Sequence, residues 1–539
     1  MGETILNEAQ MAAVSHRSGP ALVLAGPGSG KTTVITHRSV AIAKEIQSPG
    51  RLLSVTFTRA AGREMARRYC ALAGISRPKP VEIPVYQTVH AFCNGVIGIY
   101  ERASGRHFTR MEDGAGKMQL LTTLYTQINH LKPEESTLAQ IQGLMARHHQ
   151  GPCDVRNFDR IQAAYEAYKA EHNLIDFDDM ITMALRLLQE DTAFCKEISN
   201  RFDYIQVDEA QDLSAAQYEL IRLIAPHRNL FVVADDDQSI YRFRGAEPEC
   251  VFDFAKRYED CARYDLTQNY RSTGSVVSAA AKLVGHNEKR FTKDLYTTRP
   301  KGEKVQVRIF GSGGEQTTYI CDHLGKWPGS QAVLYRNTVS ALSMRLLLTA
   351  RNIPYTVRGG IESIREIEPL WMILEGILAG ERHAGLFVPG PKKTYKEMMR
   401  RGRLQALRQD FERKGVQQRY LSAVFQFAEL LVSLCATWKE CVALLSKMEK
   451  GEKAPCENAQ VILSTVHSAK GLEFDTVYMV DLVEGEFPGS GATIGDDLEE
   501  ERRLFYVGMT RAKERLFLCY PLKRGGRWEN ASRFVKEAV

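Results

Sequence analysis

Short apolar runs alternate with longer amphipathic stretches along this chain. A short apolar run bounded by polar residues predicts a buried strand, whereas apolar residues at every third or fourth position predict a helix. On this basis we expect strands at Ala21–Leu24 and Leu52–Thr58, each followed by a helix, at Thr33–Ala43 and Arg59–Tyr69. Strands and helices in alternation predict an α/β fold with a parallel sheet.

A long region without strand pattern interrupts this alternation. Residues 94–200 show helical periodicity, and strand patterns return at Tyr204–Gln206 and Leu230–Ala234. We therefore expect a first α/β lobe that is interrupted by an all-helical insertion. The lobe itself then comprises residues 1–93 and 201–263.

The second half of the chain repeats this organisation. Strand patterns occur at Val305–Phe310, Gln331–Tyr335 and Ile353–Gly359, and a helical, basic region follows at residues 381–459. Its basic run is either a solvated helix face or a DNA-binding patch, and the sequence favours neither. We expect this region to be a second helical insertion, within a second α/β lobe that comprises residues 264–380 and 460–539.

Composition narrows the class of protein. With 539 residues, 44% of them hydrophobic, the chain is long enough for several domains. Lys and Arg (71) barely exceed Asp and Glu (65), so the net charge of +6 permits a polyanionic partner without demanding one. The 11 cysteines include no Cys-x-x-Cys pair, which argues against a zinc or iron–sulfur site. No apolar run approaches about 18 residues and no signal-peptide pattern occurs, so we expect a cytoplasmic protein without a membrane partner.

A glycine-rich stretch, Ala25–Thr33 (AGPGSGKTT), connects the first strand to the first long helix. Its glycines allow backbone N–H groups to turn toward phosphate oxygens, and the helix N-terminus adds a partial positive charge. Lys31 would reach the outer phosphates, and the Thr32 hydroxyl would bind Mg²⁺. The alternative is an ordinary glycine turn, since the strict pattern has Gly in place of Ala25. The candidate nucleotide-binding residues of this loop are Gly26, Gly28, Ser29, Gly30, Lys31, Thr32 and Thr33.

Acidic and amide side chains follow two later strands of the first lobe. Asp208 and Glu209 come directly after the strand at Tyr204–Gln206, and Gln238 comes shortly after the strand at Leu230–Ala234. A carboxylate pair at the end of a buried strand can hold Mg²⁺ through Asp208 and orient or deprotonate the attacking water through Glu209. Gln238 would contact the terminal phosphate.

Other polar and aromatic residues lie where they could contact a base or a single strand. The Gln10 side chain carries a donor and an acceptor, as the adenine edge requires, although a solvated surface Gln is the simpler reading. Rings, hydroxyls and imidazoles near strand ends suit stacking and phosphate contacts with single-stranded nucleic acid. The candidates are Phe57, Thr88, His90, Tyr241 and Phe243. For His90 taken by itself, a core histidine is the more common interpretation.

Taken in order and spacing, these segments resemble the motifs of superfamily 1 helicases of the UvrD, PcrA and Rep type. The matching stretches are LNEAQ, AGPGSGKTT, TFTRAAGREM, VDEAQD, DDDQSIYRFRGA, LTQNYRS, TVHSAKGLEFDTVYMVDL and EEERRLFYVGMTRAKERLFL. The resemblance implies two RecA-like lobes, ATP and Mg²⁺ as cofactors, and an ATP-dependent 3′–5′ helicase that acts on single-stranded and tailed duplex DNA.

The resemblance also implies roles for residues whose chemistry the pattern alone does not assign. Tyr270 is expected to stack on adenine and Glu473 to hold the ribose, and Arg271 and Arg511 are expected to act as arginines on the terminal phosphate. Arg38 matches the family's arginine near the base, and His467 is expected near DNA. Trp528 follows a Gly525-Gly526 hairpin signal and would stack at a duplex junction, with a core tryptophan as the alternative.

The chain departs from this family mainly in size. The second insertion is shorter than in the family's long members, so movement on single strands is better supported than unwinding by the isolated chain. A second hypothesis is therefore an ATPase subunit that gates a partner nuclease, as in Gabija-type antiphage systems. A third is an RNA-directed motor, since stacking contacts discriminate poorly between RNA and DNA. The pathway, whether repair, replication or defence, stays open.

Overall fold

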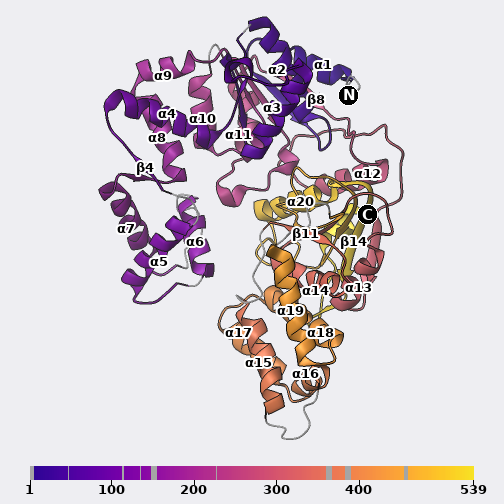
Figure 1. Cartoon of the computed structure of the whole chain (residues 1–539). Coiled ribbons are helices and arrows are strands. Elements are labelled where there is room, and N and C mark those ends of the chain that lie inside the picture. Colours follow the sequence, from indigo (N-terminus) through magenta and orange to yellow (C-terminus); the bar gives the residue numbers. More distant parts are fainter. Residues whose placement is uncertain are drawn as a thin grey trace. The chain divides into compact units, whose positions relative to one another are not determined.

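The computed structural model describes residues 5–46, 48–111, 115–133, 135–146, 155–225, 228–359, 367–382, 390–453 and 459–539. The chain forms two compact units (Figure 1). The first consists of Met1–Thr267 with Phe291–Lys293, and the second of Gln268–Arg290 with Asp294–Val539. Each unit contains a six-stranded sheet between helices, so the predicted α/β fold class with two lobes is confirmed.

The first unit is built on a parallel sheet with strand order β3-β2-β6-β7-β1-β8. Side chains of β1 alternate between two cores: Ala21 and Val23 face the core beneath helices α1, α2 and α3, whereas Leu22 and Leu24 face the core beneath α4, α8, α10 and α11. The strands are β1 (Ala21–Ala25), β2 (Leu52–Thr56), β3 (Val85–Thr88), β6 (Tyr204–Val207), β7 (Leu230–Ala234) and β8 (Ala262–Leu266). The helices are α1 (Glu8–Ser15), α2 (Lys31–Ile46), α3 (Arg59–Ala73), α4 (Val89–Ser104), α10 (Ala215–Ile224) and α11 (Glu249–Arg257).

The insertion of the first unit is mainly helical, as predicted, but it also contains a short two-stranded ladder. β4 (Thr109–Arg110) pairs with β5 (Leu174–Ile175) in parallel. These strands were missed because two residues are too few to show an alternation of apolar and polar positions. The helices are α5 (Ala115–Asn129), α6 (Glu135–Ala146), α7 (Phe158–Glu171), α8 (Phe177–Glu190) and α9 (Thr192–Ser199).

The second unit contains a parallel sheet with strand order β11-β12-β10-β13-β14-β9. Its strands are β9 (Gln306–Phe310), β10 (Gln331–Tyr335), β11 (Tyr355–Arg358), β12 (Val461–Thr465), β13 (Phe474–Met479) and β14 (Ala512–Pro521). The helices around it are α12 (Gly274–Val284), α13 (Gly313–His323), α14 (Leu342–Ala350), α20 (Gly495–Met509) and α21 (Arg533–Ala538). The three strands predicted before the second insertion therefore all form.

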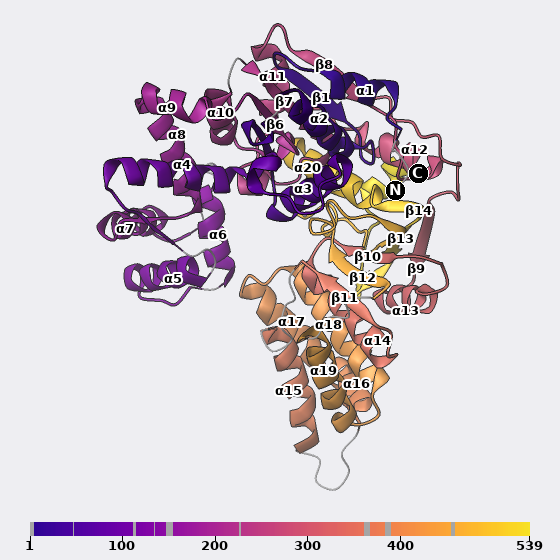
Figure 2. The ribbon, with the colours of Figure 1, turned by 45° about the horizontal axis from the view of Figure 1, so that its top comes forward.

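The second insertion is a bundle of five described helices, which extends below β11 and beside α14 in Figure 2. One helix of the lobe, α14, contributes to two hydrophobic cores at once. Leu342 and Leu346 pack in the core of the bundle, whereas Met344 and Leu348 pack beneath the second sheet. The bundle is thus joined to the lobe by continuous apolar packing. Its helices are α15 (Glu368–Arg382), α16 (Pro391–Arg400), α17 (Arg403–Arg413), α18 (Gln418–Leu434) and α19 (Trp438–Lys453).

Two predicted boundaries divide elements of the structure. The boundary between residues 263 and 264 divides β8, which pairs with β1, and the first unit continues to Thr267. The insertion predicted from residue 381 begins earlier, because α15 starts at Glu368 and packs in the bundle core. The sequence of α15 has apolar residues on both faces of the helix, so no change in pattern marks where the lobe ends and the insertion begins. Among the described residues, no helix combines the length and apolarity needed to span a bilayer.

The shared helix α14 generates a prediction about stability. Leu346 is fully buried, so Leu346→Ala removes packed atoms and leaves a cavity, and we expect the free energy of unfolding to fall by about 2–5 kcal/mol. Val442→Ala on α19, where the side chain is 59% exposed, serves as the control and should change it by less than about 0.5 kcal/mol. Urea denaturation measures both. Equal effects would show that α14 does not contribute to a packed core.

Candidate functional site

The loop between β1 and α2 turns tightly and ends at the start of a helix. Gly28 and Gly30 have φ angles of +67° and +85°, which favour glycine. The Ser29 hydroxyl donates to the Gly26 carbonyl oxygen at 2.8 Å, and α2 begins at Lys31. Backbone N–H groups at a helix N-terminus form a ready anion site, so this geometry fits the predicted phosphate loop rather than an ordinary turn.

Gln10 supports this loop from α1. Its side chain is 4% exposed, and its amide donates to the Ser29 carbonyl oxygen at 2.9 Å. The amide oxygen accepts from the backbone N–H of Asn7, which completes a capping box. A Cβ added at Gly30 would lie 2.7 Å from the Gln10 amide nitrogen. The surface reading of Gln10 is therefore wrong, and its described contacts hold the loop in shape.

Lys31 extends from the start of α2 toward the end of β7. Its ammonium lies 3.5 Å from a carboxylate oxygen of Asp235, and its side chain is 12% exposed. Strands β1 and β7 are paired in parallel, so their carboxyl ends meet at one edge of the sheet. The pairing thus brings together a lysine and an aspartate that are far apart in sequence. Thr32 and Thr33 continue the first turn of α2 directly behind Lys31.

Asp208 and Glu209 lie at the same edge, directly after β6. Burial, together with the neighbouring Glu209 carboxylate, raises the pKa of Asp208 to about 7. Glu209 has a φ of +53°, an uncommon value for a residue with a side chain. Two crowded carboxylates gain from a divalent cation, and carboxylate and hydroxyl oxygens are hard ligands. The donor set of Asp208 and Thr32 therefore fits Mg²⁺.

Gln211 connects the acidic ends of β6 and β7, a role that the sequence pattern did not predict. Its amide donates to the Glu209 carboxylate, and its amide oxygen accepts from the backbone N–H of Asp235 at 2.9 Å. It is fully buried. Gln238, in the short turn after β7, is also buried and donates to the Asp235 carboxylate. Asp235 thus donates to Gln211 through its backbone N–H and accepts from Gln238 through its carboxylate.

Arg38 does not belong to this site, and the resemblance-based prediction for it is wrong. Its side chain is 1% exposed inside the first unit, where the guanidinium lies 4.2 Å from the Phe231 ring centroid and donates to Gln206. Burial, with the nearby Arg17, lowers the pKa of Arg38 to about 9. Arg38 lies two helical turns beyond Lys31 and packs against the sheet, so it cannot reach a base from this position.

Three of the predicted nucleic-acid contacts form a row of rings in the first unit. Phe57 and Tyr241 stack with their centroids 5.1 Å apart and their planes at 13°, and Phe243 lies 6.0 Å from Tyr241. Phe243 is 46% exposed, and the Arg244 guanidinium lies 5.2 Å from the Tyr241 centroid. Phe57 and Tyr241 are half-buried, so Phe243 is the exposed ring of this row. An exposed ring beside a cation suits the stacking of bases and contact with phosphates.

Thr88 and His90 lie at the start of α4. The Thr88 hydroxyl accepts from the backbone N–H of Ala91 and so caps the helix. The His90 ring packs 4.9 Å from the Phe177 ring, and burial lowers its pKa. Both side chains therefore have structural contacts, which supports the core reading of His90.

In the second unit, Arg271 and Glu473 are paired. The Arg271 guanidinium donates to Glu473 at 2.8 Å, and Lys513 contacts the same carboxylate at 2.8 Å. Tyr270 is 42% exposed and donates to Gln268. A ring with this exposure has a face for stacking, whereas a sugar hydroxyl would compete with two cations for Glu473.

Arg511 is buried in the second unit. Its guanidinium donates to the carbonyl oxygens of Val507 and Leu472 and to the Thr510 hydroxyl. The side chain is 1% exposed, so contact with a phosphate would require the guanidinium to become more accessible. His467 is half-buried in the turns that follow β12.

Trp528 is exposed at the end of a hairpin. β15 (Lys523–Arg524) pairs with β16 (Arg527–Trp528) around the Gly525-Gly526 turn, as predicted. The Trp528 side chain is 73% exposed, with the Lys523 ammonium 4.1 Å from its centroid. The core alternative for Trp528 is therefore wrong.

Comparison with known proteins identifies similar chains over nearly the whole length. The UvrD/REP helicase N-terminal domain model matches residues 6–259, and the UvrD-like helicase C-terminal domain model matches residues 264–374 and 391–523. The Bacillus subtilis protein YjcD is 31% identical over 98% of this chain and 80% of its own. Two proteins named ATP-dependent DNA helicase PcrA, from Leuconostoc citreum and Staphylococcus aureus, are 28% identical over 99% of this chain and 84% and 86% of theirs.

The loop geometry predicts different effects for two glycines of positive φ. Ala at either position costs about 1–2 kcal/mol of backbone strain. Gly30→Ala also collides with Gln10, whereas a Cβ at Gly19 meets no atom within 4 Å. We expect Gly30→Ala to weaken binding of a fluorescent ATP analogue at least about tenfold and Gly19→Ala to leave it unchanged. Equal losses in the two variants would argue against a phosphate role for this loop.

Proposed function

The chain belongs to the UvrD-like helicase family, and from that premise we propose that it is a DNA-dependent ATPase that moves 3′ to 5′ along single-stranded DNA. The activity class is that of an ATP-dependent DNA helicase. The observation that carries the proposal is the convergence of Lys31, Asp208 and Asp235 at the carboxyl edge of the first sheet. Ligands of open α/β sheets bind at that edge.

Within this proposal, the first unit binds and activates the nucleotide. The loop N–H groups and Lys31 hold the phosphates, and Gln238 contacts the terminal one. Mg²⁺, held by Thr32 and Asp208, would neutralise charge on the phosphates. Glu209, fixed by Gln211, orients the attacking water and accepts its proton.

Residues of the second unit complete the proposed reaction. Arg271 and Arg511 stabilise the negative charge that develops on the terminal phosphate, as arginine fingers do. Tyr270 stacks on adenine through its exposed ring, and Glu473 holds the ribose after it releases Arg271. These arginine contacts would form when ATP binds and break after hydrolysis, so the conformation of both units would change in every cycle.

DNA would run over the row of rings formed by Phe57, Tyr241 and Phe243. Base stacking on aromatic side chains is worth about 1–3 kcal/mol per base and tolerates any sequence. Tyr241 and Phe243 follow Gln238 by only a few residues. One short segment thus lies between the nucleotide and the strand, which provides a route for coupling. His467 and Trp528 are proposed as further contacts, the latter at a duplex junction.

The nucleotide assignment predicts the effect of removing Lys31. Lys31→Ala should lower DNA-stimulated ATP hydrolysis by at least about 100-fold and leave the affinity for single-stranded DNA within about threefold, because the row of rings is intact. Lys44→Ala, an exposed lysine of the same helix, is the control and should behave as the wild type. Retained turnover in Lys31→Ala would refute the assignment.

The proposed polarity predicts which duplexes the chain unwinds. We expect a duplex with a 3′ single-stranded tail to be unwound in the presence of ATP, and a 5′-tailed duplex to be left intact. The rival is an ATPase subunit that gates a partner nuclease, in a defence complex of the Gabija kind. It predicts no unwinding of either duplex by the isolated chain, together with a stable partner in pull-downs from its host. Parallel titrations of ATPase activity with single-stranded DNA and with RNA distinguish a DNA-directed motor from an RNA-directed one, because only the preferred nucleic acid should stimulate hydrolysis strongly.

A further inference from the structure

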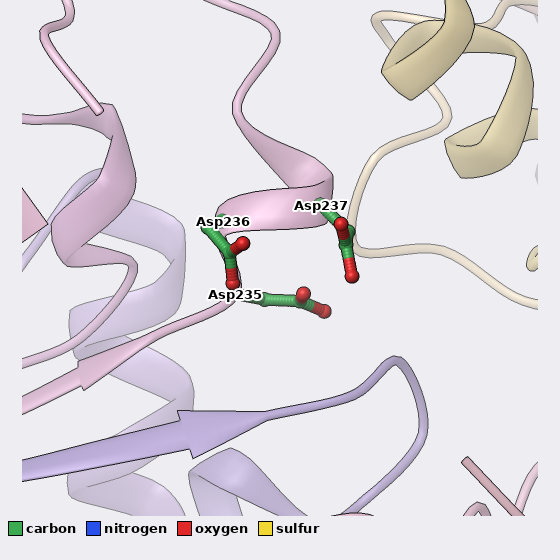
Figure 3. A group of neighbouring side chains, drawn as sticks. All are labelled: Asp235, Asp236 and Asp237. Carbon is green, nitrogen blue, oxygen red and sulfur yellow. The ribbon is translucent and has the colours of Figure 1, made fainter. Parts of the chain in front are cut away.

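Three consecutive aspartates lie buried where β7 ends. Asp235, Asp236 and Asp237 are at most 1% exposed, and one carboxylate oxygen of each lies within 4.8 Å of the others. Figure 3 shows the three carboxylates, with Asp235 directly after the strand and the other two on the turn that follows. Carboxylates this close repel one another strongly in a buried setting unless a cation is present.

The cation is a side chain of this protein. The Lys293 ammonium lies 3.0 Å from Asp235, 2.6 Å from Asp236 and 2.9 Å from Asp237, and its side chain is completely buried. Three donors of one ammonium thus face three carboxylates. The cluster is therefore a buried core feature whose negative charge Lys293 partly offsets, rather than an exposed metal site.

Lys293 reaches this position through an unusual path of the chain. The chain leaves the first unit after Thr267 and is part of it again for Phe291–Lys293 alone. The backbone N–H of Phe291 donates to Asp236 at 2.8 Å, and its ring packs 4.8 Å from the Phe252 ring. The returning segment is therefore anchored by its backbone, a ring and a buried charge.

Asp235 connects this cluster to the proposed nucleotide site. It also contacts the Lys31 ammonium at 3.5 Å and accepts from the Gln238 amide. Burial raises the pKa of Asp235, but Lys293 and Lys31 outweigh it and lower the pKa to about 2, so Asp235 stays ionised. Without Lys293, the charge of three carboxylates would draw Lys31 more strongly toward Asp235 and away from phosphates.

We propose that Lys293 is a positioning residue for ATP hydrolysis. As an internal counter-ion, it leaves Lys31 available to the phosphates, and it fixes the turn that carries Gln238. The proposal rests on the nucleotide site proposed above. It assigns a role in that site to a residue that no phosphate-binding motif contains.

The test separates charge from position. Lys293→Met leaves three uncompensated carboxylates, and we expect KM for ATP to rise about tenfold or more. The double variant Lys293→Met/Asp237→Asn returns the cluster from three net negative charges to the two of the wild type, so KM should recover to within about threefold. Lys289→Met, the same change at a half-exposed lysine four residues earlier, is the matched control.

A third variant tests whether the exact position of the cation matters. It also serves as a second test if Lys293→Met does not fold. Lys293→Arg keeps the charge but cannot place its donors as the ammonium does. We expect KM within about threefold of the wild type and a kcat at least about tenfold lower, since Gln238 shifts. Circular dichroism and thermal unfolding establish that each variant is folded.

The results that overturn the inference are distinct from those that overturn the nucleotide site. Folded Lys293→Met with a KM near that of the wild type, or a raised KM that Asp237→Asn does not lower, refutes the counter-ion role. An unchanged kcat in Lys293→Arg refutes the positioning role. If Lys31→Ala still hydrolyses ATP, the proposed nucleotide site is refuted. If Lys31→Ala loses hydrolysis while the Lys293 variants behave as the wild type, only the role proposed for Lys293 is refuted.

Discussion

The parallel pairing of β1 with β7 and of β6 with β7 is the constraint on which the nucleotide site depends. Parallel strands bring their carboxyl ends to one edge, so the loop before α2 and the acidic ends of β6 and β7 meet there. Each local sequence supplies only one part of the site. Lys31 and Asp235 become neighbours because the sheet aligns them, over a separation of 204 residues. The site residues therefore come together only when this sheet is folded.

Charge balance at this edge is the second theme. The edge carries two groups of carboxylates, Asp208 with Glu209 and Asp235–Asp237, and their states differ. The pKa of Asp208 is raised to about 7 by burial and by its neighbour, whereas that of Asp235 is lowered to about 2 because nearby ammonium groups outweigh its burial. We propose that the first group binds an external cation, Mg²⁺. The second has its own in Lys293, which explains why two acidic strand ends so close together can serve different purposes.

The sequence predicts well those features that depend on short segments. The glycine-rich turn after β1, the acidic end of β6 and the strands β1, β2, β6, β7, β9, β10 and β11 follow from glycine spacing and apolar runs, which are local. Strands β8, β12, β13 and β14 were not predicted. Features that depend on distant packing could not be predicted in this way. Lys293 is an isolated lysine between motifs, and Gln211 gains its role only through contacts with two strand ends. Arg38 shows the converse: a motif match placed it near a base, whereas the helix face on which it lies points into the core.

One further consequence follows from α14, the helix that belongs to two cores. Because α14 packs in both cores, a movement of the second sheet would be passed through this helix to the bundle. Among the described helices of the bundle α18 is the longest, and its 17 residues span about 26 Å. A tilt of roughly 10° at its base would sweep its far end through about 4.5 Å. A small rotation of the second sheet would thus become a larger displacement at the far end of the second insertion.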